Sequence, residues 1–176
     1  REQSGTAARA LEFSILTASR SGEVRGAQLE EFDLENGIWT VPADRMKAKA
    51  EHRVPLPPRA IELVKSQPSG KFVFHASTRP DKAFSDMALL AVLKRMGHRD
   101  ITVHGFRSTF RTWAAEQTSY PFEMCEVALA HKVGSEVSQA YLRSDMMEKR
   151  RRLMRDWQRH CDTPKQDAKI LPMKRN

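Results

Sequence analysis

The sequence has few of the residues that cross-link small proteins or build structural metal sites. Among 176 residues there are two cysteines, Cys125 and Cys161, which lie far apart without a CxxC motif or a Cys/His cluster. This usage argues against a disulfide framework and against a structural zinc site, and it fits a reducing cytoplasm. Tyrosine is equally scarce, with Tyr120 and Tyr141 as its two positions.

Long hydrophobic runs are also missing. No stretch of about 18 apolar residues occurs, so we expect no membrane span and no membrane partner. The first ten residues, REQSGTAARA, do not form a signal peptide and lack an initiating methionine. We therefore expect a cytoplasmic protein, of which this chain is a fragment or a processed piece.

Acidic residues are outnumbered by basic ones. The chain has 30 Lys and Arg against 22 Asp and Glu, which gives a net charge of +8. This excess favours a polyanionic partner, most simply nucleic acid, although a soluble surface that is merely basic explains it equally well. The length and the 40% apolar content fit one soluble domain with its own core.

Hydrophobic periodicity predicts an α+β domain that is mostly α-helical, with a small antiparallel sheet near the N-terminal third. The two predicted strands are IWTVPA, 38–43, and HRVPLP, 52–57, joined by a basic polar connection. We expect residues 161–176, with their two prolines, to form a flexible tail. The predicted helices span residues 6–19, 22–28, 57–65, 85–97, 105–117, 121–130, 134–143 and 145–160.

Two arginines stand in contexts that suit anion binding. Arg20 falls where one predicted helix ends and the next begins, and Glu23 can hold its guanidinium or cap the new helix. In HGFRSTFRTWAAE, Arg107 follows His104 by three positions, so the two side chains share a face of the predicted helix. A guanidinium offers a planar fork of donors that matches phosphate. Taken alone, each pair also fits a solvated helix surface.

Two further stretches supply lysine, histidine and tyrosine. In RMKAKAEHRVPLP, Lys47 and Lys49 lie on the connection between the predicted strands, where a mobile loop can carry an ammonium into a site. In ALAHKVGSEVSQAYLRSD, His131 ends an apolar helix and Tyr141 follows ten residues later. Tyrosine has a pKa of about 10 and is a poor nucleophile unless neighbouring cations stabilise its phenolate. A charged turn and a packed aromatic ring are the ordinary alternatives.

The order of these elements is more informative than any one of them. Arginine, a hairpin lysine, His-x-x-Arg, histidine and tyrosine together resemble the catalytic domain of the tyrosine recombinases, the phage integrase family. The resemblance covers residues 6–160, and HGFRSTFRTWAAE and LAHKVGSEVSQAYLRSD are its most specific parts. RSGEVRGAQLEEFDLENGIWTVPADRMK further resembles integrases of prophages and genomic islands. We expect residues 1–160 to form the catalytic domain, without the family's N-terminal core-binding and arm-binding domains.

This resemblance implies a covalent mechanism on DNA. Tyr141 attacks a phosphodiester, forms a 3′-phosphotyrosyl bond and releases a 5′-hydroxyl, and a second 5′-hydroxyl later reseals the strand. Arg20, Arg107 and His131 stabilise the extra negative charge of the five-coordinate phosphorus. His104 accepts the tyrosine proton or helps to hold the phosphate.

The resemblance also assigns a general acid. Lys47 matches the hairpin lysine that protonates the departing 5′-oxygen, with Lys49 as its rival. With this cluster of cations no metal ion and no other cofactor is implied, and the acidic run at 30–35 is interpreted as a solvated approach to a turn. Tyr120 is interpreted as structural. Arg111 is expected either to contact the DNA backbone or to face water, and we favour water.

The implied partners are double-stranded DNA attachment sites, a homotetramer assembled on DNA, and accessory DNA-bending or excision factors. An isolated fragment can instead be a monomer. Residues 145–160 fit exchange with a neighbouring protomer, which is common after the tyrosine in this family, packing on their own domain, or binding of the phosphate backbone. Two other functions stay open: DNA relaxation by a type IB topoisomerase-like enzyme, and a non-catalytic DNA-binding module in which Tyr141 has no role.

Overall fold

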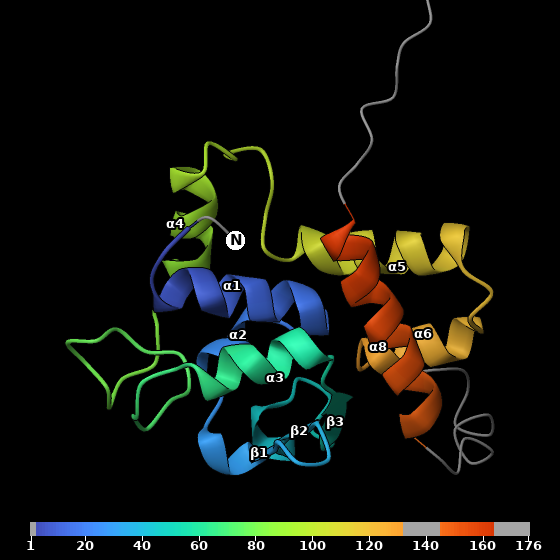
Figure 1. Ribbon diagram of the computed structural model, residues 1–176, viewed down its shortest axis with the longest axis horizontal. Helices are drawn as coiled ribbons and strands as arrows, with labels where there is room; N and C mark the ends of the chain where they lie inside the picture. Colours follow the sequence, from blue (N-terminus) through green and yellow to red (C-terminus); the bar gives the residue numbers. More distant parts are fainter. Residues whose placement is uncertain (1–2, 132–144, 164–176) are drawn as a thin grey trace, which may run out of the picture.

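The computed structural model describes residues 3–131 and 145–163. It confirms the predicted fold class, because helices dominate and one small antiparallel sheet lies in the N-terminal third (Figure 1). The helix predicted at 134–143 lies outside the described residues. The helices are α1 (Thr6–Thr17), α2 (Ser21–Arg25), α3 (Pro58–Lys65), α4 (Ala88–Arg95), α5 (Gly105–Gln117), α6 (Phe122–Ala128) and α8 (Met147–Asp162), and the strands are β1 (Phe32–Asp33), β2 (Ile38–Val41) and β3 (His52–Pro55).

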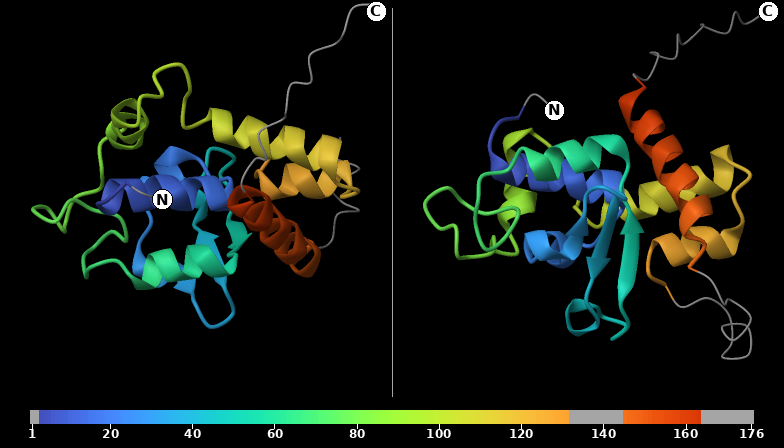
Figure 2. Two further views of the ribbon diagram at one scale, coloured as in Figure 1. Left: turned by 45° about the horizontal axis from the view of Figure 1, so that its top comes forward. Right: turned by 60° about the horizontal axis from the view of Figure 1, so that its bottom comes forward.

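Helix α1 lies at the centre of the fold, beside α3 and α4 and next to α8 (Figures 1 and 2). One apolar cluster joins α1 to the sheet, α3 and α4, and a second joins α5, α6 and α8. Ile15 packs against both clusters, and Ala10 and Phe13 are fully buried. A helix that is apolar on more than one face is expected to be buried in this way. The end of α1 therefore lies where the two clusters meet.

The sheet follows the order β1-β2-β3 with antiparallel pairing. Trp39 pairs with Val54, and Val41 pairs with His52. Because successive side chains of a strand point to opposite faces, the buried side chains of β2 alternate with partly exposed ones. Both strands end two residues earlier than predicted. β2 ends at Val41, before Pro42, which has no N–H to donate to a ladder, whereas β3 includes Pro55 as its last residue. The short connection between β2 and β3 carries both candidate lysines.

The acidic run at 30–35 is not simply solvated, and this interpretation is corrected. Residues 32–33 form β1, which was not predicted. The Glu31 side chain is only 6% exposed, accepts a hydrogen bond from Trp39 Nε1 at 2.8 Å, and forms an ion pair with Arg45. A carboxylate that serves an indole and a guanidinium in this way is a structural group that fixes the start of the sheet.

Helix α8 packs on its own domain, which is one of the arrangements left open for residues 145–160. Leu153, Met154 and Trp157 are buried in the second apolar cluster, and Trp157 Nε1 donates to the Ile15 carbonyl at 2.8 Å. The helix ends at Asp162, two residues beyond the predicted boundary. No helix among the described residues is long and apolar enough to cross a bilayer.

Four non-glycine residues of the described chain have a left-handed backbone. They are Ala18, Lys49, Ala130 and Met146, with φ between 49° and 54°. Such residues are uncommon and often adjoin functional sites. Three of them lie within two residues of a candidate site residue, namely Arg20, Lys47 and His131.

Candidate active site

A polar hollow of about 340 Å³ brings four of the predicted site residues together. Arg20 lies at the N-cap of α2, His104 at the N-cap of α5 and Arg107 in the first turn of α5. Lys47 reaches the hollow from the connection between β2 and β3. These side chains come from three separate parts of the chain, and the distances in sequence between those parts do not by themselves require that they meet.

Arg20 is held by Glu23, as the sequence suggested. One carboxylate oxygen of Glu23 accepts a hydrogen bond from the Arg20 backbone N–H at 2.8 Å, and the other accepts from Arg20 Nη1 at 2.9 Å. Glu23 is buried, whereas the Arg20 side chain is 27% exposed. The carboxylate therefore both starts α2 and orients a guanidinium that faces the hollow.

Arg107 is the most deeply buried cation at the hollow, with 5% exposure. Its guanidinium donates to the carbonyl of Ala18 and, at 2.7 Å, to the carbonyl of Leu129, so it ties α5 to the ends of α1 and α6. Burial, and then the charge of Arg20, lower the pKa of Arg107 to about 10. The group remains positively charged at neutral pH.

His131 joins this cluster through Arg107. Its Nε2 lies 3.4 Å from Arg107 Nη2, and its Nδ1 lies 2.8 Å from Glu126 Oε2. Burial raises the pKa of Glu126, but hydrogen bonds from His131 and Arg111 outweigh this effect and lower it overall. The ionised carboxylate thus fixes the imidazole ring with Nε2 toward Arg107.

Glu126 was not identified from the sequence, where a glutamate five residues before a histidine gives no distinctive signal. It also corrects the favoured interpretation of Arg111, whose side chain is only 25% exposed and forms an ion pair with Glu126. Arg111 Nε lies 2.5 Å from Glu126 Oε1, and its guanidinium lies 4.4 Å from the ring centroid of Phe122. Arg111 therefore supports the carboxylate that orients His131.

The two candidate lysines occupy different positions. Lys47 lines the hollow and follows Met46, which is 2% exposed and anchors the connection to the core. Lys49 Nζ instead lies 3.4 Å from the Asp44 carbonyl, and Lys49 is not among the residues that line the hollow. Of the two lysines, Lys47 is therefore the one placed at the hollow.

The two tyrosines differ as well. Tyr141 belongs to the stretch 132–144, which lies outside the described residues. Tyr120 donates its hydroxyl proton to Asp156 Oδ2 at 2.6 Å. Burial, together with the Asp156 carboxylate, raises the pKa of Tyr120 to about 12, which makes its phenolate less accessible. This environment agrees with a structural role for Tyr120.

His52, on β3, is a titratable neighbour that sequence reasoning missed. Burial is the main cause that lowers its pKa to about 3, and the charges of Arg150, Arg107 and Arg20 lower it further. A hydrogen bond at the Ala128 backbone acts in the opposite direction without cancelling these effects. His52 is therefore a neutral imidazole beside a group of guanidinium ions.

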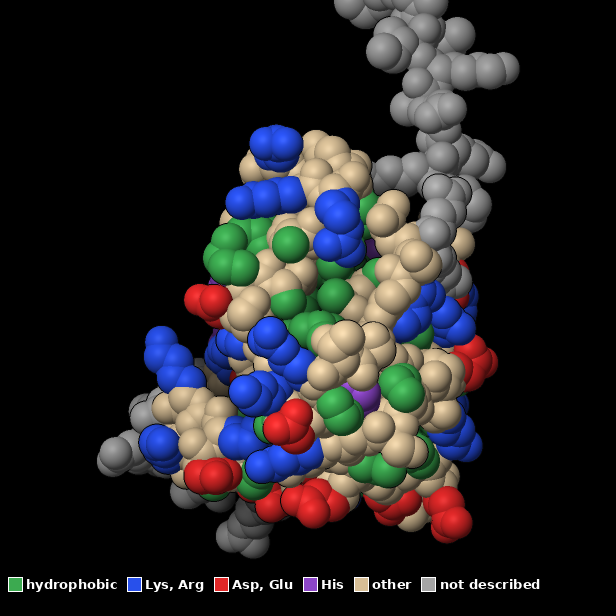
Figure 3. All heavy atoms as spheres, turned by 90° about the vertical axis from the view of Figure 1, so that its left-hand side faces the viewer, with side chains coloured by type: hydrophobic (Ala, Val, Ile, Leu, Met, Phe, Trp, Pro, Cys, Tyr) green, Lys and Arg blue, Asp and Glu red, His purple; other side chains and the backbone are tan. Residues whose placement is uncertain are grey.

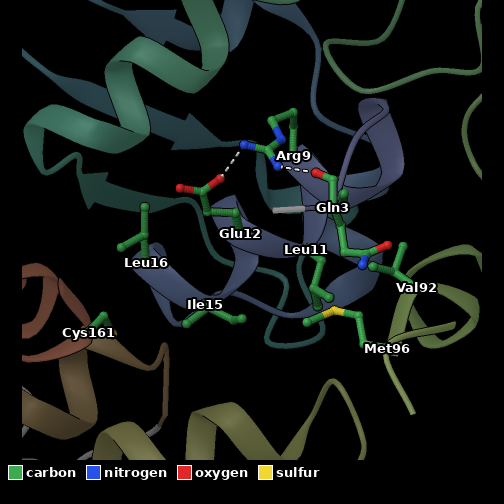
Figure 4. Close-up of a pocket in the computed structure, with 10 residues that line it drawn as sticks. Gln3, Arg9, Leu11, Glu12, Ile15, Leu16, Val92, Met96 and Cys161 are labelled. Carbon is green, nitrogen blue, oxygen red and sulfur yellow. Dashed lines mark hydrogen bonds and ion pairs between the residues drawn. The ribbon is translucent and has the colours of Figure 1, made fainter. Parts of the chain in front are cut away.

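A second hollow, of about 160 Å³, lies between α1, α4 and the end of α8 and has a different character (Figure 4). Aliphatic side chains such as Leu11, Ile15 and Val92 line it, with the Arg9–Glu12 ion pair at 2.9 Å beside them. This lining suits apolar contacts better than an anion. Within residues 3–131 and 145–163, no group of three or more His, Cys, Asp and Glu is placed to hold a metal ion.

Comparison with known proteins shows which family this chain belongs to. The model of the phage integrase family matches residues 2–148. The chain belongs to the phage integrase family. Among curated members, it is 36% identical over 150 residues to prophage integrase IntA of Escherichia coli K12, covering 82% of this chain and 36% of the relative. It is 38% identical over 152 residues to prophage integrase IntZ of the same strain, covering 84% of this chain and 38% of the relative.

A phage-encoded relative gives the same result. The integrase of Shigella phage Sf6 is 35% identical over 147 residues, covering 80% of this chain and 38% of the relative. This family member thus spans well under half the length of the curated integrases that it matches.

Solved structures confirm the fold of the family. XerA recombinase aligns with a TM-score of 0.54 at 15% identity, covering 90% of this chain and 62% of that one. XerH site-specific recombinase, bound to its difH substrate in a pre-cleavage complex, aligns with a TM-score of 0.55 at 18% identity, covering 81% and 49%.

Proposed function

We propose that this chain cuts and rejoins DNA in site-specific recombination, as the catalytic part of an integrase of a prophage or genomic island. The observation that carries the proposal is the convergence of Arg20, Lys47, His104 and Arg107 on one hollow, with His131 against Arg107. Such a cluster suits a phosphodiester, whose charge rises as its phosphorus becomes five-coordinate. The prophage integrases among the relatives support the same activity.

The arginines and His131 bind the reacting phosphate. Arg20 and Arg107 donate to its non-bridging oxygens, and both are already oriented by protein groups before DNA arrives. His131 lies against Arg107, and the Glu126 carboxylate orients its ring so that it can contact the same phosphate. Donors fixed in advance need little reorganisation during the reaction, which makes their stabilisation of the transition state effective.

Tyr141 and Lys47 carry the covalent step. The Tyr141 oxygen attacks phosphorus and gives up its proton to His104, while the bond from phosphorus to the 5′-oxygen breaks. Lys47 gives a proton to that oxygen, so a 5′-hydroxyl leaves and the 3′-phosphotyrosyl bond remains. The reverse sequence with a new 5′-hydroxyl rejoins the strand and requires no external energy source.

Basic side chains outside the hollow support DNA as the partner. Lys and Arg are spread over the side of the molecule that bears α4 and the connection before it (Figure 3). Exposed basic residues of α4 and its following loop include Lys94, Arg95 and Arg99. The XerH relative is described as bound to a DNA substrate. Double-stranded attachment sites, bound by a homotetramer, are the partners that fit this family member.

The proposal is tested with a nicked suicide duplex built from the DNA that flanks the integrated element. We expect a covalent protein–DNA adduct that resists EDTA, persists in Tyr120→Phe and disappears in Tyr141→Phe. Tyr120→Phe is the matched control because it removes the other tyrosine hydroxyl, which bonds Asp156. An adduct that survives in Tyr141→Phe contradicts the nucleophile, and relaxation of supercoiled DNA without recombination of paired sites indicates topoisomerase activity.

The general acid is tested separately. A duplex with sulfur in place of the bridging 5′-oxygen releases a thiolate, which is a good leaving group without protonation. We expect Lys47→Ala to cleave the ordinary duplex slowly and the sulfur duplex at a rate near wild type. Lys49→Ala should behave as wild type on both, and the opposite pattern would assign the role to Lys49.

A further inference from the structure

We propose that Arg150 is a positioning residue for the nucleophile, because it fixes Asp145, four residues after Tyr141, against strand β3. The inference rests on the proposed function, in which Tyr141 is the attacking group. Arg150 lies on α8 and takes no part in the hollow itself. Its contacts nevertheless join Asp145, which follows the nucleophile, to β3, which follows the general acid. The reaction requires the nucleophile and the general acid to act on the same phosphate.

The Arg150 guanidinium bridges two backbone carbonyls. Nη1 donates to the carbonyl of Asp145 at 3.1 Å, and Nη2 donates to the carbonyl of Arg53 at 2.5 Å. Arg53 belongs to β3, the strand that follows the connection carrying Lys47. The buried Arg150 side chain thus ties Asp145 to strand β3.

Asp145 is held by its side chain as well. Its Oδ2 accepts from Arg53 Nη1 at 3.0 Å, and its Oδ1 accepts from the Met147 backbone N–H at 3.1 Å. Backbone carbonyl and both carboxylate oxygens are therefore engaged, so neither the position nor the rotation of Asp145 is free. Arg53 and Asp145 are 92 residues apart in sequence, and local helix formation alone would not bring them together.

The burial of Arg150 argues for a role beyond stability. The residue is 1% exposed, and its Nε has no hydrogen-bond partner among the described residues. Burial lowers the pKa of Arg150 to about 10, so the group is still charged at neutral pH. Removing a guanidinium from water costs several kcal/mol, and the hydrogen bonds to the two carbonyls offset that cost. Because it contacts two backbone carbonyls, we infer that Arg150 serves to hold Asp145 in place against β3.

Placement at this point reaches the reacting atoms. Four residues span at most about 14 Å of extended chain, so the tie at Asp145 limits how far Tyr141 can lie from β3. A misplacement of about 1 Å at a reacting group can slow a reaction about 100-fold. The charge of Arg150 lowers the pKa of His52, and the charges of Arg107 and Arg20 lower it as well. The anchor is therefore adjacent to the candidate active site.

The test compares Arg150→Met with Arg155→Met. Arg155 lies on the same helix and is exposed, so the control makes the same chemical change without the carbonyl contacts. For each protein we measure urea unfolding, DNA affinity and the single-turnover rate of adduct formation on the ordinary and the sulfur-substituted suicide duplexes. We expect Arg150→Met to bind DNA normally and to form adduct about 100-fold more slowly on both duplexes. Arg155→Met should match wild type.

The sulfur duplex separates this role from the alternatives. A rate that recovers on sulfur means that Arg150 places Lys47 instead of the nucleophile, and an adduct rate within about twofold of wild type removes any positioning role. If Arg150→Met does not fold, Arg53→Met replaces it, because the Arg53 side chain is 43% exposed and its loss removes only the carboxylate tie. Arg53→Met should keep wild-type stability and slow both duplexes about tenfold, and an unchanged rate overturns the proposal.

Wild type and Tyr141→Phe are run beside these variants. If wild type forms no adduct, the proposed function fails and this inference fails with it. If wild type forms adduct through Tyr141 while Arg150→Met and Arg53→Met react normally, only the positioning role is refuted.

Discussion

His52 makes the stability of this protein depend on pH in a way that can be calculated. Burial, followed by the charges of Arg150, Arg107 and Arg20, lowers the pKa of His52 to about 3 in the folded protein. In the unfolded chain a histidine has a pKa of about 6.5. Protonation therefore favours the unfolded chain, so the free energy of unfolding falls as the pH is lowered through the window between these two values.

The size of the effect follows from the two pKa values. Between pH 7 and pH 5 the unfolded chain gains a proton at His52 and the folded protein does not, which costs about 2 kcal/mol of folding stability. Replacing His52 by glutamine removes the titration but keeps a side-chain donor. We expect wild type to lose about 2 kcal/mol more than His52→Gln over this pH range.

Urea unfolding of both proteins at the two pH values measures this difference directly. Groups such as Glu126 are present in both proteins, so their own titration cancels in the comparison. An equal loss of stability in wild type and His52→Gln would refute the reasoning. A histidine titration followed by NMR that gave His52 an ordinary pKa would refute it independently, because it would show that neither burial nor the neighbouring guanidinium ions lower the pKa of the ring.

Three further substitutions test the packing and the site. Gly70→Ala would place a Cβ atom 2.5 Å from Nε2 of His75, so we expect a loss of about 1–3 kcal/mol in urea unfolding, and unchanged stability would contradict this contact. Glu126→Gln should slow adduct formation about tenfold, because a neutral amide holds His131 less firmly than the carboxylate at 2.8 Å does; a wild-type rate would show that this contact is dispensable. Trp157→Phe removes a buried hydrogen bond to α1 and should cost about 1–3 kcal/mol, with a smaller loss arguing that α8 repacks.

Local spacing predicted the parts of the site that depend on near neighbours. The Arg20–Glu23 pair and the position of Arg107 three residues after His104 follow from the geometry of a single turn, and the structure contains both. The small sheet and the position of Lys47 between its strands were also readable, because alternation and a polar connection mark a hairpin. The roles of these residues in catalysis remain predictions.

The contacts that hold the site together are long-range and left no such pattern. Arg107 bonds a carbonyl 89 residues away at Ala18, and backbone carbonyls have no signature in sequence. The same holds for His52, whose pKa depends on arginines that other elements bring to it. Arg111 was misread because Glu126 lies on another helix. Burial of a charge is decided by the whole fold and cannot be deduced from one segment.

Ala18 and Ala130, which have a left-handed backbone conformation near Arg20 and His131, have a consequence for protein engineering. An alanine at positive φ costs about 1–2 kcal/mol relative to an alanine in the right-handed helical region, and glycine avoids that cost. Glycine also permits many more backbone conformations, so it would loosen the two turns that present the arginine and the imidazole. A selection for heat resistance alone would therefore tend to accept glycine at positions 18 and 130 while making the turns less exact. Stability and activity should be screened together in this protein.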